Sequence, residues 1–161
     1  MLIRGEDPAD TAGVRAVVER AYGRPDEAQL VERLRADGDA VLAAVAVNDE
    51  IIVGHVMLSG MTAPFRAVGL APVAVLPEWQ RRGIATELIR WALRRVEQQG
   101  YKGVFVLGDP RFYHRFGFDP QTAAGFENPY AGPHFMALAF GPTLPATTGR
   151  VDYAPAFAGL G

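Results

Sequence analysis

The sequence of 161 residues contains no cysteine, one serine and one lysine. The absence of cysteine excludes disulfide bonds, thiolate metal sites and a cysteine acyl-enzyme. The single lysine, Lys102, lies outside any glycine-rich context, so the chain has no Walker-type phosphate loop. The single serine, Ser59, has no adjacent histidine and carboxylate constellation, and nothing supports a serine ester intermediate.

Long apolar runs and a strong charge bias are also missing. No run reaches membrane-spanning length and no charged-then-apolar leader follows Met1, so we expect no membrane partner and a cytoplasmic location. The formal net charge is only −2, which gives no sign of a nucleic-acid partner. The hydrophobic fraction of 49% and the charged fraction of 21% are typical of globular proteins. We therefore predict one domain over residues 1–161.

Charge is distributed unevenly along the chain. Residues 78–115 contain eight basic and four acidic side chains, a local charge of +4, which leaves −6 for the remainder. A basic segment suits a polyanionic ligand, and an acidic remainder suits a cationic acceptor such as an amine. The alternative is that Arg90, Arg94 and Arg95 are simply solvated on an exposed helix face.

The apolar periodicity predicts a mixed α/β fold. Asp7-Pro8, with Asp10 three residues after the cap, is typical of a helix start, and 48–50 join two apolar runs as in a β-hairpin. Pro120 is expected to end the short unit before it, and 151–157 to form at most a short strand or a packed tail. Strands are predicted at 2–4, 40–47, 51–59, 65–75, 104–107 and 135–140, and helices at about 8–22, 26–36, 83–98 and 110–114.

The segment 73–86 joins an apolar strand to the long amphipathic helix and is the strongest candidate for a phosphate site. The first amides of a helix lack internal partners and lie at the positive end of its dipole. Gly83 allows the backbone to approach an anion closely, and Arg81 and Arg82 add charge. A dinucleotide fingerprint fits less well, because it needs three glycines at fixed spacing. An ordinary turn with solvated arginines is the simpler alternative.

Gln80, Gly83 and Ala85 form a Gln-x-x-Gly-x-Ala pattern, which resembles the acetyl-CoA pyrophosphate loop of the GNAT superfamily of N-acetyltransferases. Tyr113, followed by Phe116-Gly117, stands where that superfamily has its Tyr-x-x-x-Gly-Phe signature. The resemblance covers roughly residues 2–140, leaves 141–161 as a C-terminal extension, and is to a poorly characterised bacterial branch of small acetyltransferases. It implies a mixed, mostly antiparallel central sheet with helices on both faces and a splayed strand pair.

The resemblance also implies where acetyl-CoA binds. The pantetheine arm would pair with the main chain of Val73, Ala74 and Val75, and the Val75 amide would polarise the acetyl carbonyl. Because Pro77 cannot extend a β-ladder, we expect the strand to end and splay from residues 104–107 there. Asp109, which replaces an asparagine of many relatives, is included in the cofactor site, although we favour a helix cap as its role. The residues expected at the pyrophosphate are Gln80, Arg81, Arg82, Gly83, Ile84, Ala85 and Thr86.

Tyr113 is the predicted catalytic residue, because the tyrosine at this place in the family protonates the thiolate of CoA. A phenol has a pKa above that of a thiol, from which we expect the proton transfer to be favourable. The alternative is a packing role beside Phe112, Phe116 and Phe118.

The general base stays open at this point. Glu78 follows the donor strand but is also placed to satisfy a helix dipole. His55 lies in an apolar strand, where a histidine is more often a hydrogen-bonded core residue, and His114 points away from Tyr113 on its helix. Asp109 or a chain of water molecules completes the set of candidates.

The function predicted from these features is acetyl-CoA-dependent transfer of an acetyl group to a primary amine of a small molecule or peptide. The lack of cysteine favours direct attack in a ternary complex, without a metal. The first alternative is a catalytically idle acyl-CoA-binding module, and the second is a structural dimerisation unit without a ligand. A homodimer is compatible with any of these functions, and the sequence does not identify the amine.

Overall fold

The computed structural model describes residues 1–160. Within those residues, no helix is both long and apolar enough to cross a membrane. The strands are β1 (Leu2–Gly5), β2 (Ala40–Asn48), β3 (Ile51–Gly60), β4 (Ala67–Val75), β5 (Gly103–Leu107), β6 (Phe126–Glu127), β7 (Phe135–Ala139) and β8 (Gly149–Arg150). The α-helices are α1 (Thr11–Tyr22), α2 (Asp26–Ala36), α3 (Ile84–Gln98), α4 (Pro110–Tyr113) and α5 (Pro120–Ala123). The 3₁₀ turns are η1 (Pro8–Asp10), η2 (Pro77–Trp79), η3 (His114–Phe116) and η4 (Pro155–Gly159).

Six strands form the main sheet in the order β1-β2-β3-β4-β5-β7. All neighbours are antiparallel except β4 and β5, which run parallel and are connected through α3. This confirms the predicted mixed, mostly antiparallel sheet. A second, two-stranded parallel sheet of β6 and β8 was not predicted.

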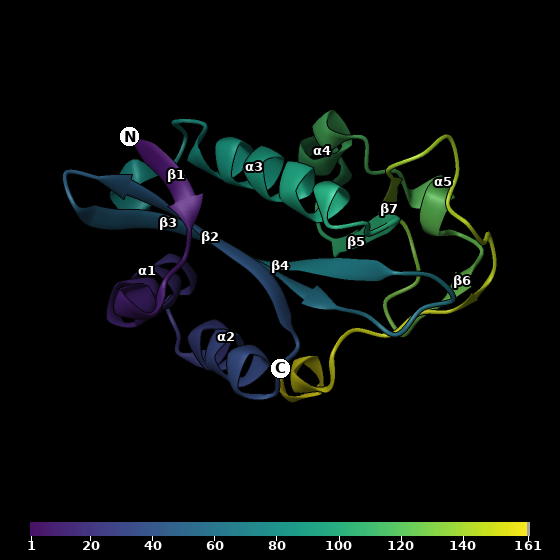
Figure 1. Cartoon of the computed structure of the whole chain (residues 1–161), viewed down its shortest axis with the longest axis horizontal. Coiled ribbons are helices and arrows are strands. Elements are labelled where there is room, and N and C mark those ends of the chain that lie inside the picture. Colours follow the sequence, from purple (N-terminus) through teal and green to yellow (C-terminus); the bar gives the residue numbers. More distant parts are fainter. Residues whose placement is uncertain (161) are drawn as a thin grey trace.

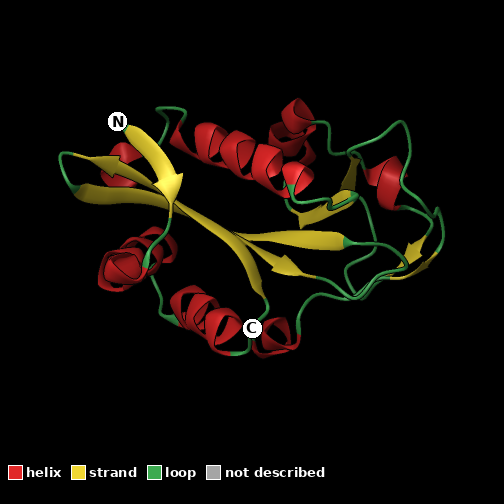
Figure 2. Ribbon diagram, viewed as in Figure 1, coloured by secondary structure: helices red, strands yellow, loops and turns green. Residues whose placement is uncertain are grey.

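Helices cover both faces of the main sheet, as expected (Figures 1 and 2). On one face α3 packs closely, since a Cβ placed on Gly54 of β3 would lie 3.0 Å from both Ile84 and Leu88. On the other face α1 packs against β3 and β4, and η4 at the C-terminal end lies beside α2. Both apolar faces of the sheet are thereby removed from water, which is the main stabilising contribution.

Three helical segments begin with the same dipeptide. Asp7, Asp109 and Asp119 each precede a proline, and each carboxylate accepts a hydrogen bond from a backbone N–H of the first turn. Proline suits the first turn because its missing N–H would have no partner there. The short helical unit before Pro120 ends at the C-cap Gly117, and Asp119-Pro120 begins α5, a helix that was not predicted.

The predicted splay lies between β4 and β5. Their pairing ends with Gly69 opposite Phe105, and beyond these residues β4 pairs only with β3 while β5 pairs only with β7. The expected position at Pro77 was wrong. The β3–β4 register is irregular between Val73 and Leu70, where β4 contains an extra residue, and such a bulge increases the twist that turns a strand away from its neighbour. We call the region beyond Gly69 and Phe105 the divergence.

Candidate functional site

The edge of β4 at the divergence presents main-chain polar groups. The N–H of Leu76 donates to the carbonyl of Val53 on β3 over 2.9 Å. Because residues alternate in direction along a strand, the N–H and C=O groups of Val73 and Val75 point away from β3. They therefore face the divergence, where β5 is no longer paired with β4.

Two side chains hold the carbonyl groups of this edge. The Tyr22 hydroxyl at the end of α1 donates to the Val73 carbonyl over 3.0 Å. The Gln80 side-chain amide donates to the Val75 carbonyl over 3.1 Å. Both carbonyl oxygens thus have hydrogen-bond donors, while the Val73 and Val75 N–H groups point into the divergence.

The loop after β4 leads directly into the N-terminus of α3. Arg81 and Gly83 both have left-handed backbone conformations, with φ of 65° and 79°, and Gly83 is the N-cap. No side chain of the described residues caps this helix, whereas the carboxylates named above cap η1, α4 and α5. The N–H groups of Ile84, Ala85 and Thr86 are the first three of α3 and have no partner within the helix. This end of α3 is available to an anion.

A hollow of about 340 Å³ lies between this loop and α4. Seven of the predicted cofactor residues line it, and three other residues, Trp79, Phe112 and Arg115, complete it. Arg82 lies just outside, with its guanidinium 4.7 Å from the Trp79 ring centroid. The lining residues are Val75, Trp79, Gln80, Arg81, Gly83, Ile84, Ala85, Thr86, Phe112 and Arg115.

The remaining predicted cofactor residues lie outside this hollow. Val73 and Ala74 belong to β4 next to Val75. The Asp109 carboxylate accepts from the Arg111 N–H over 2.9 Å and forms an ion pair with the Arg111 guanidinium. The side-chain hydrogen bond from Arg111 is the main reason why the pKa of Asp109 is lowered. Asp109 therefore caps α4, which is the role that the sequence favoured for it.

Tyr113 ends α4 and its ring lies among aromatic side chains. The Phe112 and Phe118 rings contact it edge-on, with centroids 5.0 and 5.8 Å away. Burial raises the pKa of Tyr113 to about 12, and the nearby Tyr22 phenol contributes in the same direction. The Tyr22 hydroxyl is itself hydrogen-bonded to the Val73 carbonyl on the exposed edge of β4.

The raised pKa changes the proton chemistry expected of Tyr113. A simple thiol has a pKa near 8.5, so complete transfer from a phenol of pKa about 12 to a free thiolate is uphill by roughly 5 kcal/mol. The expectation that this transfer is favourable was wrong in sign even for an ordinary phenol, whose pKa near 10 already lies above that of a thiol, and burial makes the transfer more unfavourable. A buried, fully protonated phenol instead donates a strong hydrogen bond to a sulfur atom while negative charge develops on it.

The candidate bases differ in their surroundings. Glu78 accepts two hydrogen bonds of 2.9 Å from Arg20, and these lower its pKa. His114 is exposed, and its Nδ1 lies 2.9 Å from the carbonyl of Arg111, so this nitrogen carries the hydrogen. Neither residue is placed by these contacts beside Tyr113.

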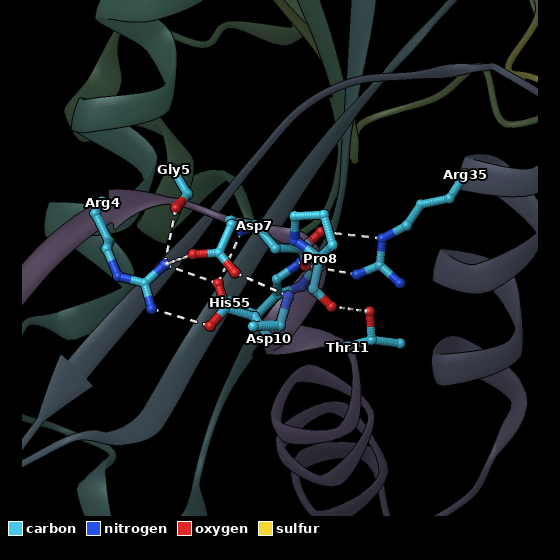
Figure 3. A network of polar contacts seen from close by, with 10 residues as sticks. Arg4, Gly5, Asp7, Pro8, Asp10, Thr11, Arg35 and His55 are labelled. Carbon is cyan, nitrogen blue, oxygen red and sulfur yellow. Dashed lines mark hydrogen bonds and ion pairs between the residues drawn. The ribbon is translucent and has the colours of Figure 1, made fainter.

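His55 belongs to a polar network between β1, η1, β3 and α2 (Figure 3). Its fully buried ring has Nε2 3.0 Å from Glu6, and Glu6 also binds Arg35. Burial would raise the pKa of Glu6, but the hydrogen bonds from His55 and Arg35 outweigh burial and lower it. In the same network Asp10 binds Arg4, and this bond lowers the pKa of Asp10. His55 is thus a buried residue whose Nε2 contacts Glu6 and whose Nδ1 has no hydrogen-bond partner among the described residues.

Sequence reasoning missed Tyr22, Trp79 and Arg115 as residues of this region. Arg115 was counted among the basic residues, but its position next to the loop depends on the packing of α4. Tyr22 falls at the apolar spacing of α1, so the sequence pattern gives no indication of a role for its hydroxyl. Within residues 1–160 no group of three histidine or acidic side chains is arranged to hold a metal ion.

Known proteins resemble this chain in sequence. The sequence model described as "Acetyltransferase (GNAT) family" matches residues 12–118. The uncharacterised N-acetyltransferase YhbS of Escherichia coli K12 is 39% identical over 123 residues, 74% of each chain. The uncharacterised N-acetyltransferase YjhQ of the same strain is 35% identical over 136 residues, 79% of this chain and 75% of YjhQ.

Solved structures show the same arrangement. E. coli YhbS in complex with CoA superposes with a TM-score of 0.92 at 34% identity, covering 99% of this chain and 93% of that one. A GNAT family acetyltransferase from Brucella melitensis in complex with acetyl-CoA gives a TM-score of 0.83 at 36% identity, covering 97% of both chains. The fold, the match over residues 12–118 and these relatives establish that the chain belongs to the GNAT family of acetyltransferases.

Proposed function

We propose that this protein transfers an acetyl group from acetyl-CoA to a primary amine of a small molecule or peptide, by direct attack in a ternary complex. The observation that carries the proposal is the divergence of β4 and β5 beside the uncapped N-terminus of α3. The relatives from E. coli and B. melitensis, crystallised with CoA and acetyl-CoA, support this choice of donor.

In this proposal each part of the donor has its own contacts. The pyrophosphate binds the N–H groups of Ile84, Ala85 and Thr86, next to the charges of Arg81 and Arg115. The pantetheine arm lies along β4 and accepts a hydrogen bond from the Val73 N–H, because the carbonyls of this edge already have donors. The Val75 N–H is left for the thioester carbonyl.

The chemistry begins when the neutral amine nitrogen attacks the thioester carbonyl carbon. The Val75 N–H donates to the carbonyl oxygen as it becomes negative, and a backbone donor in such a position contributes about 100-fold or more to kcat. The C–S bond then breaks, and the Tyr113 hydroxyl donates a hydrogen bond to the departing sulfur. The amine nitrogen loses one proton to water or a base and the departing thiolate takes one proton from water, so the products are an N-acetyl amine and CoA.

The experiment is incubation with acetyl-CoA and a library of primary amines, with free thiol and then product mass as readouts. Because the chain has no cysteine, the protein itself adds nothing to the thiol signal. The proposal predicts thiol release that depends on the amine and an acceptor mass increased by one acetyl group. CoA binding without turnover on any amine would instead favour an idle acyl-CoA-binding module.

A further inference from the structure

The C-terminal segment, residues 141–160, brings Tyr153 to the start of the divergence. A Cβ placed on Gly69 would lie 2.6 Å from Cε1 of the Tyr153 ring, so the ring rests directly on the backbone there. Gly69 is the last β4 residue paired with β5. Three aromatic rings also contact the Tyr153 ring, those of Tyr130, Phe135 and Phe157, with centroids 6.0, 6.3 and 5.1 Å away. Phe157 belongs to η4, which packs beside α2 (Figure 1).

The Tyr153 hydroxyl is buried and has no hydrogen-bond partner among the described residues. Burial raises the pKa of Tyr153, and the phenols of Tyr130 and Tyr113 are close enough to raise it further. A buried hydroxyl without a partner costs about 1–3 kcal/mol relative to a bonded one. The Ser59 hydroxyl, on the cross-strand partner of Gly69, is also buried without a partner in the described chain. Two unsatisfied hydroxyl groups thus belong to residues that contact or pair with Gly69.

Apolar side chains are exposed around the same region. Tyr22, Leu107 and Tyr130 are 41, 46 and 42% exposed. Leu107 is the last residue of β5, within the divergence. The Tyr22 hydroxyl donates a hydrogen bond to the Val73 carbonyl, and the centroid of the Tyr130 ring lies 6.0 Å from that of the Tyr153 ring. Exposed apolar groups beside a strand divergence can contact an apolar ligand.

Carboxylates close to Tyr22 and β4 already have cationic partners. Glu27, whose charge acts on the Tyr22 phenol, is buried and binds Arg24 over 2.9 Å. Glu78, just after β4, binds Arg20. These two groups are therefore neutralised and do not favour a polycationic ligand.

We infer that Tyr153 is a specificity-determining residue for the acetyl acceptor, and that the acceptor is a primary amine on an apolar ring body with one uncharged hydrogen-bonding substituent. The Tyr153 hydroxyl pairs with that substituent, and the exposed rings of Tyr22 and Tyr130 contact the body of the acceptor. This inference rests on the proposed function, because it concerns the second substrate of the same reaction.

The test compares three probe amines at saturating acetyl-CoA, with thiol release as the readout. Tyramine has the ring and the hydroxyl, 2-phenylethylamine has only the ring, and spermidine is a polycation without a ring. The expected order of kcat/KM is tyramine, then 2-phenylethylamine, then spermidine. Tyr153→Phe is expected to raise the KM for tyramine about tenfold, while the KM values for 2-phenylethylamine and acetyl-CoA stay within about twofold.

Tyr101→Phe is the matched control, because Tyr101 packs under Arg66 after α3 and lies outside the Tyr153 cluster. It is expected to leave all three KM values unchanged. The melting temperature of Tyr153→Phe should equal or exceed that of the wild type, because the variant removes an unsatisfied group.

Three results would overturn the inference. The first is a preference for spermidine or for another amine of the library without a ring. The second is an unchanged tyramine KM in Tyr153→Phe. The third is a lower melting temperature of that variant, which would show that the fold already satisfies the hydroxyl. Absence of thiol release with every amine is a different outcome, because it overturns the proposed function itself and the inference with it.

Discussion

The ring of Tyr113 lies directly on Gly108, where a Cβ would stand only 2.4 Å from Cε2 of the ring. Glycine at this position allows the phenol to lie close to the end of β5. Gly108→Ala is therefore expected to displace the ring while the loop at Gly83 stays intact. We expect kcat to fall about 10- to 100-fold and the KM for acetyl-CoA to change less than about twofold, as measured by thiol release.

The matched control for this change is Gly141→Ala. A Cβ there would meet only Thr143 at an ordinary 3.7 Å, so kinetics close to wild type are expected. Equal effects of the two substitutions would contradict a positioning role for Gly108.

Tyr113→Phe keeps the aromatic packing and removes the hydroxyl. We expect kcat to fall about 100-fold, while CoA binding measured by calorimetry stays close to wild type. Because the pKa of Tyr113 is raised to about 12, the phenol stays protonated far above neutral pH. The wild-type kcat should therefore show no descending limb between pH 7 and 10, and a descending limb centred near pH 9 would contradict this assignment.

The same pKa shifts predict how stability depends on alkaline pH. A tyrosine of the unfolded chain ionises near pH 10, whereas the folded-state pKa is about 12 for Tyr113 and is also raised for Tyr153. The stabilisation is fully present below pH 10 and is lost as pH rises through the folded values. Tyr113 alone accounts for a loss of about 3 kcal/mol in the free energy of unfolding.

Urea unfolding at pH 8 and pH 11.5 measures the part of this loss that is complete by pH 11.5, about 2 kcal/mol for Tyr113. Tyr153→Phe should reduce the difference between the two pH values, since a phenylalanine side chain cannot ionise, and Tyr101→Phe serves again as the control. A difference that is the same in the wild type and in Tyr153→Phe would show that the hydroxyl is solvated in the folded protein.

The grouping of the loop residues around one hollow could be predicted because its signals are local in the sequence. Gln80, Gly83 and Ala85 lie within six residues, and Asp109-Pro110 predicts the start of a helix. The hairpin of β2 and β3 follows from two apolar runs and a short polar turn. In each case the residues that form the feature are neighbours along the chain.

The rest depends on contacts between distant segments. The divergence begins at Gly69 because of the register of β3, β4 and β5, whereas the sequence offered only Pro77 as a signal. Tyr22 reaches Val73, and Tyr153 reaches Gly69, across more than fifty residues each. An apolar periodicity places such side chains on a face but does not identify the group their hydroxyls meet.

Arg115 gives a test of the basic hollow. It was not predicted as a cofactor residue, but it lines the hollow and its guanidinium lies 4.5 Å from the Phe112 ring centroid. Arg115→Met removes the charge and keeps a long apolar side chain. We expect the Kd for CoA to rise about tenfold, the size of one lost hydrogen bond to a charged group.

Calorimetry at low and moderate salt measures this effect. Arg94→Met is the control, because Arg94 is exposed on α3 and lies outside the hollow. Salt should weaken CoA binding more in the wild type than in Arg115→Met, since one screened contact is missing in the variant. If the two substitutions weaken binding equally, Arg115 acts only through the overall charge.

A crystal structure of this protein with CoA tests the central claim most directly. We predict that the arm of CoA lies between β4 and β5 beyond Gly69, with its pyrophosphate on the N–H groups of Ile84 to Thr86 and its sulfur within hydrogen-bond distance of the Tyr113 hydroxyl. CoA bound outside the divergence, or a sulfur atom far from Tyr113, would contradict the account.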